Sequence, residues 1–145
     1  MEDEGWRTKE MPFKFEKLEV YQLALAYVDL AYEIASLLPA SEEYNLKSQL
    51  KRAATSVVLN IAEGSTGQTD AEQTRFLGMA IRSLLETVAC QHLIRRRGFV
   101  PGQDIFDKAY QQAEILAAKL HAFRKSLDPQ QKWIREGESI YVVDE

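Results

Sequence analysis

The residues best suited to chemistry in this sequence are two histidines, His92 and His121, and a single cysteine, Cys90. A di-iron site in a helical bundle needs Glu-x-x-His on two helices. The residues three positions before the histidines are Ala89 and Ala118, so that metal-binding pattern is absent. Cys90 and His92 point about 200° apart on a helix, which excludes a thiol–imidazole pair and favours a small buried thiol. The sequence also lacks a glycine-rich phosphate loop and a serine nucleophile motif, so we predict no enzyme, no metal and no cofactor.

Charged side chains inside apolar rows form the second candidate set, and they allow two interpretations. The favoured one is ion pairs that fix the register of the helices, at Arg52, Glu63, Arg82 and Glu86; Arg82 and Glu86 are four residues apart on one helical face. The alternative is a basic strip that contacts nucleic-acid phosphate, made of Lys47, Lys51, Arg75, Arg95, Arg96 and Arg97. Phosphate contact needs several cations on one surface and weakens steeply with salt. The three consecutive arginines also suit the C-terminal end of a helix.

Four helical segments must position these residues. The first is predicted from Phe15 to Leu38, ahead of Pro39, and the second from an N-cap at Ser41 to Gly64, a natural residue after a helix end. The third opens with a capping box, Thr69-Asp-Ala-Glu72, and ends at Arg97 before Gly98; the fourth covers about 103–127. Short loops join them, which predicts an all-α fold, an antiparallel up-down-up-down four-helix bundle.

The first helical segment is apolar on nearly every side. Its polar positions trace one thin stripe at helical spacing: Glu19, Gln22, Asp29, Glu33 and Ser36. A surface helix of a single domain normally has one apolar stripe and a broad polar face. In a short chain, we expect the second covering surface to be another copy of the protein. The sequence therefore predicts a homo-oligomer.

The composition bounds the class of protein. The chain has 145 residues with 46% hydrophobic and 28% charged residues, which is typical of one globular domain. Its formal net charge of −4 argues against a general polyanion binder. One cysteine suits a reducing compartment, no apolar run is long enough for a membrane span, and the N-terminus is acidic, unlike a signal peptide. We expect a cytoplasmic protein that makes no membrane contact.

We divide the chain into three parts. Residues 1–13 are predicted to be a flexible lead, 14–128 the four-helix bundle, and 129–145 a C-terminal tail. The β-branched stretch Ile140–Val143 gives the tail an extended pattern. Such a segment lies over a groove, reaches a neighbour or frays; the sequence leaves these alternatives open.

Several segments occur together in an order and spacing that resemble a known family: Phe15–Gln22, Tyr44–Val57, Asn60-Ile-Ala-Glu-Gly64, Arg75–Leu77 and Ser83–Glu86. The chain resembles the bacterial four-helix-bundle family of proteins encoded in 23S rRNA intervening sequences. It is also similar to the accessory variability determinant of diversity-generating retroelements. The resemblance covers roughly residues 13–126.

The resemblance implies a homopentameric, barrel-like assembly of bundles without known enzymatic activity. Its retroelement members use a basic surface to bind nucleic acid and a reverse transcriptase. Two departures weaken that second property here. The family's usual Ile-Pro-Ser before Asn60 is replaced by Val57-Val-Leu59, and the loop Thr66–Glu72, typically basic, carries two acids and no base.

The leading hypothesis for function is a non-enzymatic, self-assembling scaffold or adaptor. The alternative is a nucleic-acid-binding accessory protein, partnered with RNA, DNA or a reverse transcriptase.

Overall fold

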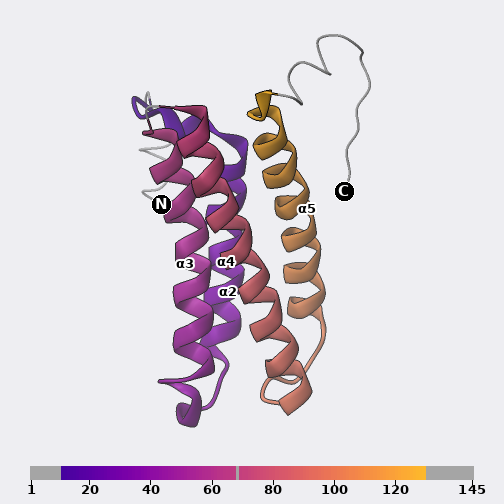
Figure 1. Cartoon of the computed structure of the whole chain (residues 1–145). Helices are drawn as coiled ribbons and strands as arrows, with labels where there is room; N and C mark the ends of the chain where they lie inside the picture. The colour runs from indigo at the N-terminus through magenta and orange to yellow at the C-terminus, as the bar shows by residue number, and fades with distance from the viewer. Residues whose placement is uncertain (1–10, 68, 130–145) are drawn as a thin grey trace.

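The computed structural model describes residues 11–67 and 69–129. These residues contain no strand and four α-helices: α2 (Glu19–Ser36), α3 (Leu46–Ser65), α4 (Asp70–Arg97) and α5 (Asp104–Ser126). Two short 3₁₀-helices, η1 (Lys14–Lys17) and η2 (Ala40–Glu42), precede α2 and α3. The four α-helices lie side by side along one direction (Figure 1). The predicted all-α fold with four helices is confirmed, whereas residues 1–10 and the extended segment of the tail lie outside the described residues.

None of the described helices is both long and apolar enough to cross a lipid bilayer.

Helix α2 is covered on two sides by its own chain. Its fully buried residues recur at helical spacing: Val20, Ala24, Tyr27, Ala31 and Ile34. On one flank the Tyr32 hydroxyl lies 3.3 Å from the Thr55 hydroxyl of α3; on the other, Lys119 of α5 forms an ion pair with Glu19 at 3.4 Å. The burial of two flanks that we expected from a second copy is therefore provided by α3 and α5. Self-assembly must therefore be argued from features other than the apolar burial of α2.

The starts of α2 and α3 differ from the predictions. Leu18 has an extended backbone (φ −74°, ψ 131°), which interrupts the helical conformation between η1 and α2. Helix α2 therefore begins at Glu19 instead of Phe15. Ser41 is not the N-cap of α3, because η2 occupies that position and Asn45 precedes the helix. The Glu42 carboxylate instead accepts hydrogen bonds from the Leu46 N–H (3.3 Å) and from Asn45 Nδ2 (3.0 Å). A side-chain carboxylate thus stabilises the free N–H end of α3.

The ends of α4 agree with the sequence. Thr69 is its N-cap, and the Thr69 hydroxyl accepts a hydrogen bond from the Glu72 N–H at 3.1 Å. Gly98 follows the last turn with φ 70°, a left-handed conformation that glycine adopts without strain. Helix α5 differs from its predicted range by one residue at each end.

Gly64 serves a different purpose from the one predicted. It does not follow α3 but lies inside the helix, buried, in its last turn. A Cβ placed on Gly64 would lie 2.8 Å from Cβ of Phe76 in α4, closer than two carbon atoms can approach. The glycine is therefore required because α3 and α4 come together at this point.

A hydrogen-bonded polar group crosses the core between α2 and α4. Gln91 Nε2 donates to the Tyr27 hydroxyl at 2.7 Å, and Tyr27 and Thr87 share a hydrogen bond of 2.7 Å. Thr87 donates to the Leu84 carbonyl at 2.6 Å, so the Tyr27 hydroxyl donates to Thr87. All three side chains are at most 4% exposed. Burial raises the pKa of Tyr27, while these hydrogen bonds lower it.

We predict that Gly64→Ala lowers the free energy of unfolding by about 1–3 kcal/mol, because the new methyl overpacks the contact with Phe76. Gly78→Ala is the matched control: the atoms nearest to its Cβ would be those of the Arg124 guanidinium, at 3.2 Å and beyond, at the end of a flexible side chain. Since alanine forms helix better than glycine, the control variant should be as stable as the parent or gain up to about 1 kcal/mol. Urea unfolding followed by circular dichroism measures both. Equal stability of the two variants would contradict the assigned role of Gly64.

Candidate functional site

A small polar cluster lies at the contact between α3 and α4. The Ser83 hydroxyl donates to the Ser56 hydroxyl at 3.0 Å, and Asn60 Nδ2 donates to the same Ser56 oxygen at 3.0 Å and to the Ser56 carbonyl at 2.9 Å. These contacts fix the axial register of α4 relative to α3. The cluster is half-buried and connects the Asn60–Gly64 segment of α3 to α4.

The four residues predicted to form ion pairs are exposed: Arg52 and Glu63 on α3, Arg82 and Glu86 on α4. Within the described part of the chain, they form no ion pair with one another within 4.0 Å; the ion pairs there are Lys47–Glu43 (3.0 Å) and Lys119–Glu19 (3.4 Å). An exposed pair such as Arg82–Glu86 gains little energy in water, so a single chain does not hold it together. The ion pairs that we predicted to fix the register of the helices at these four positions are therefore not formed between the described residues.

Cys90 lies under this surface, at 4% exposure. Burial raises the pKa of its thiol above the ordinary value; the Glu86 carboxylate raises this pKa further and the Arg52 guanidinium lowers it. His92 is exposed while Cys90 is buried, which agrees with the predicted divergence of the two side chains. In the ranges 11–67 and 69–129, no three His, Cys, Asp or Glu side chains come together as a metal site.

The six basic residues predicted to contact phosphate do not share one surface. Lys47 pairs with Glu43, and Lys51 Nζ lies 5.1 Å from the centre of the Tyr32 ring. Arg75 stacks on Phe76, next to Gly64 at the end of α3, whereas Lys47 is at the start of α3. These two ends are roughly 25 Å apart at 1.5 Å per residue.

The three consecutive arginines also point in different directions. Arg95 lies over the Phe106 ring, at 5.4 Å, so it faces α5. Arg97 faces the start of α3, where it borders a pocket, and Arg96 is exposed between them. The strip predicted from the sequence is thus divided among three surfaces.

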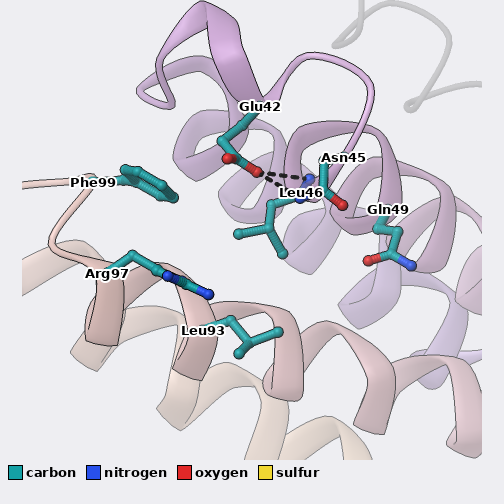
Figure 2. A pocket seen from close by; sticks show the side chains of 7 residues that line it. All are labelled: Glu42, Asn45, Leu46, Gln49, Leu93, Arg97 and Phe99. Carbon is teal, nitrogen blue, oxygen red and sulfur yellow. Dashed lines mark hydrogen bonds between the residues drawn. The ribbon is translucent and has the colours of Figure 1, made fainter.

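A pocket of about 360 Å³ lies between the start of α3 and the end of α4. Figure 2 shows Glu42 on one wall and Arg97 on the opposite wall, with the amides of Asn45 and Gln49 along one side. The apolar part of the lining consists of Leu46, Leu93 and Phe99. A carboxylate and a guanidinium therefore face one pocket without forming an ion pair.

The comparison with protein families agrees with the resemblance in the sequence. The family model described as 23S rRNA-intervening sequence protein matches residues 16–122. The chain belongs to this family. The matched region contains the polar cluster, the pocket and the Gly64–Phe76 contact, so all three are inside the family's shared domain. No curated protein matches the chain.

Sequence reasoning missed two groups of residues. The core hydrogen bonds of Tyr27, Thr87 and Gln91 were overlooked. Thr87 and Gln91 interrupt the apolar row of α4, and such polar residues in an apolar row indicate buried hydrogen bonds. The pocket residues Glu42 and Phe99 come from connecting segments, whose positions only the folded chain determines.

We predict that the Cys90 thiol reacts with Ellman's reagent roughly a hundredfold more slowly in the native protein than in urea, because reaction requires local opening of the helix pair. The raised pKa acts in the same direction, since at a given pH the native thiol holds less thiolate than the unfolded one. Absorbance at 412 nm follows the reaction, and Cys90→Ser provides the blank. Equal native and unfolded rates at neutral pH would show an accessible, activated thiol instead.

Proposed function

We propose that this chain is the non-enzymatic subunit of a cytoplasmic homo-oligomer, in which antiparallel up-down-up-down bundles assemble through oppositely charged faces and act as a scaffold. Large apolar side chains are exposed around the bundle, including Leu59, Leu85 and Ile115. Scattered apolar residues are normal on any protein surface, so they support assembly without deciding it. The distribution of charge carries the proposal.

Charge is divided unequally among the helices. Helices α3 and α4 together carry eight bases against four acids, whereas α2 carries three acids and no base. These acids are all exposed: Glu19, Asp29 and Glu33. Contact between like faces of two copies would bring equal charges together. Contact between unlike faces is favourable, and such head-to-tail contacts form a ring where the rotation between successive copies closes.

Two residues at matching heights are suited to meet in such a ring. The Tyr32–Thr55 and Ser56–Ser83 hydrogen bonds place Tyr32 of α2 and Ser83 of α4 at about the same height along the bundle. Asp29 and Arg82 therefore lie within about one helical turn of the same height. Rotation about an axis parallel to the helices preserves height, so Arg82 of one copy can approach Asp29 of the next. The number of five subunits is carried over from the family resemblance alone.

The test is a charge swap measured by multi-angle light scattering of the full chain. Asp29→Arg and Arg82→Asp should each reduce the assembled fraction at micromolar concentration, because each places like charges opposite each other. The double variant should recover assembly. Glu114→Arg is the matched control, with the same change of charge at an exposed position in the middle of α5, and it should assemble normally. An oligomer insensitive to both single reversals would contradict the proposed contact.

A second candidate function is nucleic-acid binding, alone or with a reverse transcriptase. The observation that favours it is the exposed last turn of α4, where Arg96 and Arg97 form no ion pair with any residue of 11–67 or 69–129. Free guanidinium groups are the usual contacts for phosphate.

For this candidate we expect a gel shift of RNA or DNA that weakens steeply with salt and is lost in the Arg96→Ala, Arg97→Ala double variant. The variant Lys108→Ala, Lys125→Ala removes the same charge from α5 and serves as the control. Absence of a shift at low salt would eliminate nucleic-acid binding and leave the assembly proposal intact.

A further inference from the structure

The pocket between α3 and α4 contains opposite charges held apart. The Glu42 carboxylate is fixed through one oxygen, Oε1, which accepts hydrogen bonds from the Leu46 N–H and from Asn45 Nδ2. The bonds drawn in Figure 2 leave its second oxygen free on the side toward Phe99. Arg97 approaches from the end of α4 and forms no ion pair within the described part of the chain. The two groups border one space but stay more than 4.0 Å apart.

The other residues that line the pocket restrict which ligands with two charges can bind. Leu46 is buried and forms the floor beneath Asn45 and Gln49, while Leu93 and Phe99 provide apolar wall. About 360 Å³ is at the lower end of volumes typical for small-molecule sites. A ligand that fits must be small, carry an ammonium group for Glu42 and a carboxylate for Arg97, and place an apolar group on the leucines. Side-chain amides that both donate and accept hydrogen bonds suit such a zwitterion.

We propose that this pocket binds an α-amino acid with an apolar side chain. Its carboxylate pairs with Arg97, where a guanidinium offers two parallel N–H donors. Its ammonium group donates to the free oxygen of Glu42, and its side chain lies against Leu46 and Leu93. The site is formed within one chain, so this binding is independent of the proposed assembly.

The experiment uses the full ¹⁵N-labelled chain and L-leucine as the probe. Binding should shift the side-chain amide signals of Asn45 and Gln49, which line the pocket. Leucinamide lacks the carboxylate and 4-methylpentanoic acid lacks the ammonium group; each should bind about tenfold more weakly, the usual effect of losing one charge-assisted hydrogen bond. Unmoved Asn45 and Gln49 signals at 10 mM leucine, on the order of the weakest affinity expected for so small a ligand, overturn the proposal. Equal binding of the three compounds also overturns it.

Variants assign the two charges. Arg97→Gln should remove the preference for leucine over leucinamide, and Glu42→Gln, which keeps an acceptor for the Leu46 N–H, should remove the preference over the acid. Arg96→Gln is the matched control, since it removes the neighbouring arginine outside the pocket lining and should leave both preferences unchanged. Loss of preference in the control, or its retention in both pocket variants, counts against the assignment. If a variant does not fold, the comparison of leucine, leucinamide and 4-methylpentanoic acid on the unaltered protein still tests whether the pocket binds an amino acid.

Discussion

The contact between α3 and α4 at Gly64 and Phe76 is the constraint on which the rest of the structure depends. Because Gly64 has no side chain, α3 can approach Phe76 of α4 closely at this point. This contact fixes the register of the two helices, and the same register holds along their whole length. The Ser56–Ser83 hydrogen bond follows from that register half-way along α3. The pocket between Gln49 and Arg97 follows from it at the far end. A shift of one residue between the two helices would misplace all three features.

The buried hydrogen bonds of Tyr27, Thr87 and Gln91 add a second restraint, on the position of α2 relative to α4. Tyr27 connects α2 to α4 across the core, and the Tyr27 and Thr87 hydroxyl hydrogens each have an acceptor. A buried hydroxyl or amide without a partner costs about 1–3 kcal/mol, so any rotation of α2 that separates Tyr27 from Thr87 and Gln91 is disfavoured. This restraint fixes which face of α2 is turned outward. The acidic residues Asp29 and Glu33 are consequently presented on the surface.

Much of the fold could be predicted from sequence because helix periodicity and capping are local signals. Thr69, Gly98 and the limits of α5 were located to within one residue for that reason. The start of α3 could not be located, because Glu42 replaces the expected cap by folding back from η2. Gly64 was misinterpreted for a related reason: a glycine near a helix end has the same sequence pattern whether it terminates the helix or admits a neighbour. The site was least predictable, since the pocket and the opposed charges depend on which turns of α3 and α4 lie side by side.

We propose that one chain is a subunit and that opposite charges on α2 and α4 join copies to one another. Sedimentation equilibrium of the full chain at micromolar concentration and moderate salt tests it most directly, because the measured mass does not depend on molecular shape. Assembly through opposite charges predicts one species whose mass is a whole multiple of the 16.6 kDa chain and which dissociates as salt screens the charges. A mass of 16.6 kDa at every concentration and low salt would contradict it.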